Sequence, residues 1–234
     1  MSIKIYQFGS CRSRLGPYVN NNIKFINNID CTHTLEQVLQ YIDIYKNKTK
    51  LNEMEIPTLF LNNVDANIDY YMNELNSCDY ILIEISSMKN AKYKDCVCQL
   101  DRLTAFKNNC GNQFETIKNE IVYYNTTEEE IYTNLEIIKK RTNKKIILMG
   151  HINLKFDNFE PFKYNNFFCK ERQQIDNILL KSGELKIFYS EVFPETNWKI
   201  ICNCENNDDI YHLTEYAYKQ LGMFLTNVIT INSN

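Results

Sequence analysis

The chain has 234 residues, which is enough for one α/β domain with a full hydrophobic core. Hydrophobic residues make up 44% and charged residues 24%, a balance that excludes disordered and fibrous proteins. The formal net charge is −3 and the lysines form no basic stripe, so nucleic acid is not expected as a main partner. We therefore expect a single folded domain over residues 1–234.

No apolar run approaches the roughly 20 residues that a membrane helix requires, and the amino terminus lacks the pattern of a secretory signal. The sequence thus predicts a cytoplasmic protein without a membrane span. Its nine cysteines lack the paired C-x-x-C spacing of a zinc site, so most are expected to be reduced thiols. Nothing in the sequence requires a metal or a cofactor, and the oligomeric state is left open.

The first expected strand, at residues 3–8, runs into the turn Gly9-Ser10. A short helix is expected within residues 13–18 and a second strand at 23–29. Thr34 is predicted to cap a helix over residues 35–46, where apolar residues recur at helical spacing. Asp65 is expected to begin the next helix, which extends to about residue 75.

Residues 80–85 form an almost continuous apolar run, typical of a strand buried on both faces at the centre of a parallel sheet. The pattern over residues 88–126 is mixed. It predicts a strand or hairpin near 96–100 and a helix near 114–121. We interpret the whole region as an insertion over the active face. Thr127 precedes three glutamates, so a helix is expected to begin there and to extend to about residue 141.

The carboxyl-terminal part predicts a strand at 145–150, a helix at 166–181, a strand at 185–189, an extended segment at 198–202 and a final helix from near His212. Strands that alternate with helices at this spacing favour a parallel sheet with helices on both faces. We expect an α/β protein, namely a single-domain, three-layer α/β/α sandwich with a mostly parallel, flavodoxin-like sheet. In such sheets ligands bind at the carboxyl ends of the strands, where Ser10 and Ser86 fall.

A serine hydroxyl becomes a nucleophile when an imidazole accepts its proton and a carboxylate orients that imidazole. Of the three histidines, His212 has Asp209 three residues before it, a D-x-x-H spacing that suits this pairing. A satisfied or exposed imidazole is the alternative for each histidine, and an ordinary structural turn is the alternative for Gly9-Ser10.

Together, Phe8-Gly9-Ser10-Cys11-Arg12 and Asp209-Ile210-Tyr211-His212-Leu213-Thr214 resemble the first and last sequence blocks of the SGNH, or GDSL-type, hydrolase family. The resemblance implies Ser10 as nucleophile, His212 as general base and then acid, and Asp209 as the residue that orients His212. The motifs cover only the two ends of the chain.

The chain departs from this family in the oxyanion hole. No glycine occurs between Gly16 and Gly111, so the second-block glycine is absent, and an N–H near His33 would have to serve instead. Where the family has Gly-x-Asn-Asp, this chain offers Ser86, Ser87 and Asn90 as candidate donors. The loss of one such donor typically costs about 10²- to 10³-fold in rate.

Four further residues have two interpretations each. His151 is either part of a pocket wall or an ordinary residue after a strand. Arg12, like Arg14, could bind an anionic group, although a solvated or salt-bridged role is the favoured alternative. Cys11 is either a thiol nucleophile or a buried packing residue, and we expect packing, because adjacent side chains usually diverge and its thiol should point away from Ser10.

The function predicted from these features is that of a serine esterase or deacylase acting on an acyl ester, such as an O-acetylated carbohydrate. One alternative is an O-acyltransferase that modifies a glycan with the same site. The other is a non-catalytic SGNH-like binding domain that has lost the oxyanion hole.

Overall fold

The computed structural model describes residues 2–29, 31–47, 50–59, 67–153, 170–193, 198–202 and 212–232. It divides into two compact units, which are described separately. The sheet unit comprises Met1–Asn27, Cys78–Ser87 and Lys144–Asn234, and the second unit comprises Asn28–Ser77 and Met88–Asn143.

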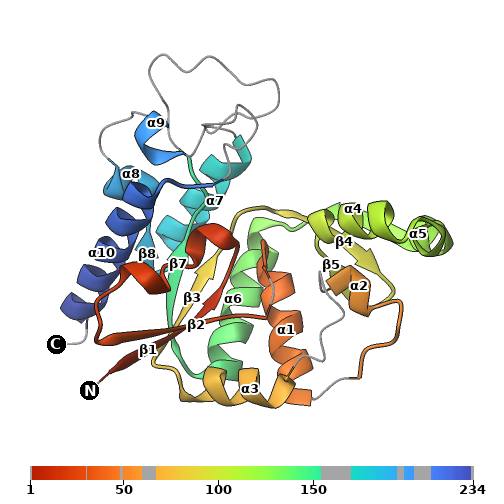
Figure 1. Ribbon diagram of the computed structural model, residues 1–234, viewed down its shortest axis with the longest axis horizontal. Helices are drawn as coiled ribbons and strands as arrows, with labels where there is room; N and C mark the ends of the chain where they lie inside the picture. Colours follow the sequence, from red (N-terminus) through yellow and green to blue (C-terminus); the bar gives the residue numbers. More distant parts are fainter. Residues whose placement is uncertain are drawn as a thin grey trace. The chain divides into compact units, whose positions relative to one another are not determined.

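The sheet unit is built on five parallel strands in the order β2-β1-β3-β7-β8 (Figure 1). The strands are β1 Ile3–Phe8, β2 Ile23–Asn27, β3 Tyr80–Glu84, β7 Lys145–Met149 and β8 Leu185–Ile187. Counted along the chain, this is the flavodoxin-like order 2-1-3-4-5. The predicted α/β class and the mostly parallel sheet are therefore confirmed, with β3 at the centre.

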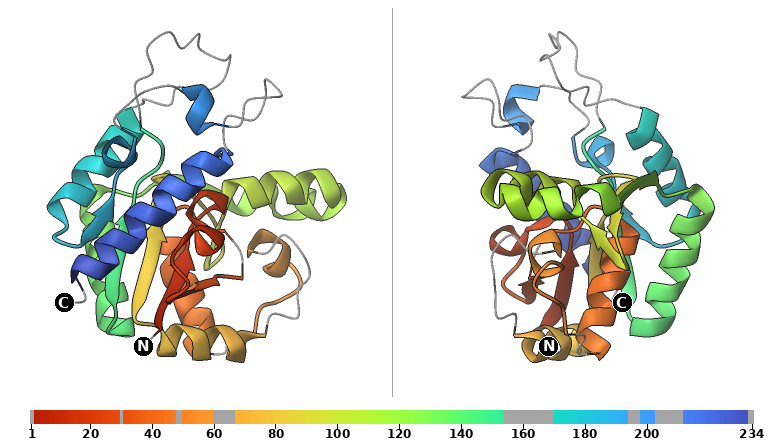
Figure 2. Two further views of the ribbon diagram at one scale, coloured as in Figure 1. Left: turned by 60° about the vertical axis from the view of Figure 1, so that its left-hand side comes forward. Right: turned by 90° about the vertical axis from the view of Figure 1, so that its right-hand side faces the viewer.

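One face of this sheet is covered by α10, Glu215–Asn232 (Figure 2). Every third or fourth residue of α10 is apolar, and these side chains join those of the strands in one buried cluster. Members of the cluster include Ile5, Leu82, Ile147, Ile187, Leu221 and Leu225. The opposite face of the strands is also apolar, and Tyr6, Phe8, Ile81 and Ile83 on it are fully buried.

Two expectations for the carboxyl-terminal part of the sheet unit are wrong. The strand expected at 185–189 ends at Ile187, because Phe188 is the N-cap of the short helix α8, Tyr189–Val192. The segment expected to be extended at 198–202 forms helix α9, Trp198–Ile201, and only Cys202 makes a β-bridge, with Leu213. Short apolar runs do not distinguish a strand from a buried helical turn.

Three more helical segments belong to the sheet unit. After β1 come two 3₁₀ turns, η1 Cys11–Ser13 and η2 Gly16–Tyr18, in place of the single short helix expected at 13–18. Helix α7, Lys170–Lys181, connects β7 to β8, as a parallel pair requires. Residues 166–169, where this helix was expected to begin, lie outside the described residues, and so does Asp65.

The second unit contains an antiparallel sheet in the order β5-β4-β6, formed by β4 Lys89–Tyr93, β5 Cys96–Cys98 and β6 Ile121–Asn125. Its helices are α1 Leu35–Asn47, α2 Ile56–Leu59, α3 Ile68–Ser77, α4 Leu100–Asn109, α5 Gly111–Ile117 and α6 Glu128–Thr142, with a 3₁₀ turn η3 at Lys118–Glu120. The helix predicted at 35–46 is confirmed. So is the helix start at Thr127, where Thr127 and Glu130 form a reciprocal capping box.

The hairpin expected near residue 96 is also present, as β4 and β5. The helix expected at 114–121 ends at Ile117, and Ile121 instead begins β6, which pairs with β4. Neither the proposed insertion at 88–126 nor the single-domain organisation is tested by these observations, and both remain predictions. No helix in the described part of the chain is long and apolar enough to cross a membrane.

Candidate active site

The candidate site lies where β1 and β3 end side by side. The strand order reverses between these two strands, and ligands of doubly wound sheets bind outside the carboxyl ends of the strands at such a point. Phe8 pairs with Ile83, so the next residues along each strand, Gly9 and Glu84, lie beside one another. The switch point thus brings Ser10 next to Glu84.

Gly9 allows this close approach of the two strands. A Cβ atom at this position would lie 2.3 Å from Ser13 Oγ and 2.7 Å from Glu84 Cβ, distances that no real side chain tolerates. The backbone angle φ of +156° also favours glycine. The glycine therefore sets the distance between the nucleophile turn and β3.

Ser10 begins the 3₁₀ turn η1 and is only 4% exposed. Its hydroxyl donates to Glu84 Oε2 at 2.6 Å, and its backbone N–H donates to the same oxygen at 2.8 Å. As the N-cap of η1, Ser10 Oγ also accepts a hydrogen bond of 3.3 Å from the backbone N–H of Arg12. The hydroxyl has one proton, so in this structure Ser10 donates it to a carboxylate.

The side chain of Arg12, in η1, contacts the other oxygen of the Glu84 carboxylate. Its Nε lies 3.1 Å from Glu84 Oε1, and the two side chains are 6% and 0% exposed. Burial is the largest single effect on the pKa of Arg12 and would lower it, but the neighbouring groups together, Glu84 foremost, outweigh burial and raise the pKa above its ordinary value. The favoured interpretation of Arg12 as a salt-bridged residue fits this geometry.

Two tyrosines lie close enough to the Glu84–Arg12 pair to be affected by its charges. Burial, and secondly the charge of Glu84, raise the pKa of Tyr189 well above its ordinary value. Burial raises the pKa of Tyr218 to about 12, and its hydroxyl donates to the Cys11 carbonyl at 3.4 Å. Both phenols are therefore protonated hydrogen-bond donors at neutral pH, and the Tyr189 hydroxyl has no hydrogen-bond partner among the described residues.

A second polar cluster lies where β7 ends against α7. Asn153 donates to Asp176 at 2.6 Å, and Arg172 donates to the Ile152 carbonyl at 2.8 Å. His151 is buried, with its Nε2 3.4 Å from Arg172 Nη2. Burial raises the pKa of Asp176, against the lowering effects of Asn153 and Arg172. His151 is therefore packed against α7, and its role in a pocket wall remains a prediction.

The candidate oxyanion donors that follow β3 differ in their contacts. The Ser87 hydroxyl donates to Glu171 at 3.0 Å. The Ser86 hydroxyl is buried and has no hydrogen-bond partner within the described ranges. Of these two serines, only Ser86 has a hydroxyl without a hydrogen-bond partner among the described residues.

Of the carboxyl-terminal motif, residues 209–214, only the part from His212 onward lies among the described residues. His212 is exposed and lies just before α10, next to the bridge residue Leu213. Asp209 lies outside the described residues. The roles assigned to His212 and Asp209 thus remain predictions.

The other two candidates, His33 and Asn90, belong to the second unit. Gln37 connects them, since its Oε1 accepts from the His33 backbone N–H at 2.7 Å and its Nε2 donates to Asn90 Oδ1 at 3.4 Å. Asn90 also accepts from Thr34 and donates to Thr126, so its Oδ1 accepts two hydrogen bonds and its Nδ2 donates one inside this unit. Asn90 is thus held by side chains of the second unit, and the roles of His33 and Asn90 as oxyanion donors remain predictions.

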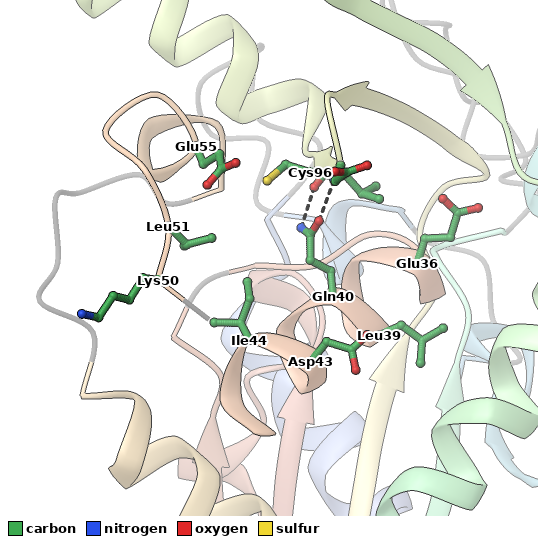
Figure 3. Close-up of a pocket in the computed structure, with 11 residues that line it drawn as sticks. Glu36, Leu39, Gln40, Asp43, Ile44, Lys50, Leu51, Glu55 and Cys96 are labelled. Atoms are coloured by element: carbon green, nitrogen blue, oxygen red, sulfur yellow. Dashed lines mark hydrogen bonds between the residues drawn. The ribbon is translucent and has the colours of Figure 1, made fainter. Parts of the chain in front are cut away.

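The second unit also contains a cavity of about 520 Å³ between α1, the segment that precedes α2, and β5 (Figure 3). Its wall carries four carboxylates, of Glu36, Asp43, Glu55 and Asp95, and one ammonium group, of Lys50. Gln40 exchanges two hydrogen bonds with the Val97 backbone there, drawn as dashed lines in Figure 3. Three of the carboxylates are already engaged: Glu36 by Tyr124, Asp43 by Arg141 and Glu55 by the Asn52 backbone.

No group of three or more His, Cys, Asp or Glu side chains suited to a metal ion occurs within the described ranges. No disulfide is formed among the cysteines of the described ranges, and Cys11, expected to be a buried packing residue, is half-buried.

The fold and the buried serine–carboxylate pair define an α/β protein with a candidate catalytic serine at its switch point. The family model described as the TviD N-terminal domain matches residues 3–116, a range that includes Ser10, Arg12 and Glu84 and ends before His212. The chain is also 27% identical over 124 residues to protein PFC0760c of Plasmodium falciparum; the match covers 53% of this chain and only 4% of that protein.

Among solved structures, the chain is similar to a protein from Parabacteroides merdae that is described as a GDSL-like lipase. The two share 11% identity with a TM-score of 0.41, over 97% of this chain and 96% of that one.

The residue that sequence reasoning missed is Glu84. It was treated only as part of the central strand, although it is the one charged residue in the buried run Tyr80-Ile81-Leu82-Ile83-Glu84-Ile85. A carboxylate at the end of a strand that is buried on both faces must have a polar or charged partner. This requirement could have identified Glu84 as a candidate site residue from the sequence.

Proposed function

We propose that this chain is a serine-dependent enzyme that acts on an acyl ester, with Ser10 as the nucleophile. The observation that supports this most is the position of Ser10 at the switch point, where a buried carboxylate holds its hydroxyl at 2.6 Å. A nucleophile within hydrogen-bond reach of a group that can accept its proton is the arrangement that covalent catalysis needs. The range that matches the family model, residues 3–116, contains Ser10, Arg12 and Glu84.

In this proposal Ser10 Oγ attacks the acyl carbonyl and water later releases the acyl group, as in an esterase or deacylase of the SGNH type. His212 carries protons to and from the reacting oxygens, and Asp209 orients its imidazole, as the D-x-x-H spacing suggests. An O-acetylated carbohydrate is the substrate class that we propose.

Transfer of the acyl group to a glycan is the second candidate reaction for the same site. It differs only in the group that attacks the acyl enzyme, a sugar hydroxyl in place of water. Turnover of acetyl-CoA that requires a sugar acceptor would favour transfer. Release of p-nitrophenol from p-nitrophenyl acetate without an acceptor would favour hydrolysis.

A non-catalytic binding domain is the third candidate, and one observation favours it. Ser10 is only 4% exposed, and both its N–H and its O–H are directed to Glu84. If this arrangement is purely structural, Ser10 has no nucleophilic role.

Labelling with a fluorophosphonate probe, followed by peptide mass spectrometry, tests the proposal. We expect one adduct, on Ser10, and its loss in Ser10→Ala. The matched control is Ser77→Ala, which removes an exposed serine of α3 and should leave labelling unchanged. Absence of labelling in the wild type would favour the binding domain, and labelling that survives Ser10→Ala would refute Ser10 as the nucleophile.

A further inference from the structure

Glu84 has the geometry of a catalytic base toward Ser10. The distance of 2.6 Å from Ser10 Oγ to Glu84 Oε2 lies within the range over which a general base accepts a proton. The other carboxylate oxygen is fixed by Arg12 Nε at 3.1 Å, so a third group orients the base. Nucleophile, base and orienting group are thus the three parts that define an activated serine.

We propose that Glu84 takes the proton from Ser10 Oγ as Ser10 attacks the acyl carbonyl. This inference rests on the proposed function, because it requires Ser10 to be the nucleophile. It adds a second proton-transferring group to the site. His212 then gives a proton to the departing alcohol and takes one from the incoming water or acceptor.

In the first half of the reaction, the Ser10 O–H bond breaks and its proton moves to Glu84 Oε2. The bond from Oγ to the acyl carbon forms, and the carbonyl electron pair moves to oxygen. Collapse of this intermediate expels the alcohol, which takes a proton from His212, so His212 begins the cycle as an imidazolium. In the second half, water or an acceptor hydroxyl gives a proton to His212, and Ser10 Oγ recovers its own from Glu84, so the cycle balances.

The hydrogen bond from the Ser10 N–H gives this step a second consequence. In the resting structure that N–H donates to the charged oxygen Oε2 at 2.8 Å and is not available for an oxyanion. Once Oε2 is protonated it becomes a weaker acceptor, since hydrogen bonds to ionised groups are about twice as strong as neutral ones. The N–H is then released as negative charge develops on the carbonyl oxygen, so the backbone N–H of the nucleophile itself can act as an oxyanion donor.

Fluorophosphonate labelling isolates the proposed proton transfer, because fluoride leaves without needing a proton. The rate of adduct formation on Ser10 is measured by intact-mass spectrometry for the wild type, Glu84→Gln and Glu84→Asp. We expect Glu84→Gln to be labelled at least about 100-fold more slowly, the usual contribution of a general base. Glu84→Asp, which keeps the carboxylate, should be labelled faster than Glu84→Gln, and equal rates for these two variants would contradict the proposal.

Two further variants separate this effect from misfolding. Glu191→Gln changes an exposed carboxylate of α8 in the same unit and should be labelled at the wild-type rate. Arg12→Met/Glu84→Gln removes both buried charges together. If Glu84→Gln does not melt cooperatively, its labelling rate cannot be interpreted, and the double variant is measured instead. The folded double variant should be labelled as slowly as is expected for Glu84→Gln.

Failure of this inference is distinct from failure of the proposed function. A wild type that is never labelled refutes Ser10 as a nucleophile. A wild type labelled at Ser10, with a folded Glu84→Gln variant labelled just as fast, overturns only the role of Glu84.

Discussion

The two units each contain an arginine–carboxylate pair, and the pairs differ in their exposure to water. In the sheet unit, Glu84 and Arg12 are 0% and 6% exposed. In the second unit, Asp43 of α1 and Arg141 of α6 are 43% and 40% exposed. Water screens the second pair and weakens it, whereas the first pair lies where an unpaired charge is expensive. The buried pair can therefore fix the position of Ser10, while the exposed pair contributes little beyond solubility.

Removing one partner from each pair should show the largest difference between them. Glu84→Ala should lower the free energy of unfolding by about 3–5 kcal/mol, because it removes the carboxylate that neutralises a buried guanidinium. Asp43→Ala should lower it by less than about 1 kcal/mol. Urea denaturation of both variants measures this contrast.

The double variant Arg12→Met/Glu84→Gln tests whether the loss of stability in Glu84→Ala comes from the unpaired charge of Arg12. Because a buried pair is often replaceable by uncharged groups at little cost, the double variant should recover most of the stability lost in Glu84→Ala. If Glu84→Ala and Asp43→Ala lose equal stability, burial does not distinguish the two pairs and the comparison fails.

The close packing around Glu84 should make Gly9 intolerant of a methyl group. Gly9→Ala should cost about 1–3 kcal/mol, because its Cβ would overlap Ser13 Oγ and Glu84 Cβ. Gly111→Ala is the control in the second unit, where an added Cβ meets nothing within 4 Å. Thermal melting should separate the two variants, and a Gly9→Ala protein as stable as the wild type would refute the tight turn.

A third carboxylate, Glu130 in the capping box of α6, should show the smallest effect. Thr127→Ala should lower the free energy of unfolding by about 1 kcal/mol near neutral pH. Hydrogen bonds from the Thr127 backbone and side chain lower the pKa of Glu130 from its ordinary value of 4.5. Its stabilisation is therefore complete above that value and is lost as the pH falls through the lowered pKa.

Denaturation of wild type and Thr127→Ala at neutral and acidic pH measures this dependence. The difference between the two proteins should shrink on acidification. A difference that grows instead would contradict the role of the capping box.

Much of the sheet unit could be predicted from local patterns. The apolar runs at β1, β3 and β7 mark strands buried on both faces, and the alternation with helices gives the parallel sheet. The helix start at Thr127 was also predictable, since its capping box is formed within four consecutive residues, Thr127 to Glu130. These elements follow from short-range sequence.

The rest depends on partners that are distant in the sequence. Strand β6 pairs with β4 across about 30 residues, which no local pattern indicates. Helix α9 has an apolar composition that suits a strand equally well. At the candidate site, Ser10 could be predicted from its turn, but the contact with Glu84, 74 positions away, arises only from the strand order.

The most direct test of the account is the rate at which a fluorophosphonate labels Ser10 in the wild type and in folded Glu84→Gln. We expect a single adduct on Ser10 in the wild type and a labelling rate at least about 100-fold lower in the variant. An adduct on a different residue, or equal rates in the two proteins, would contradict it.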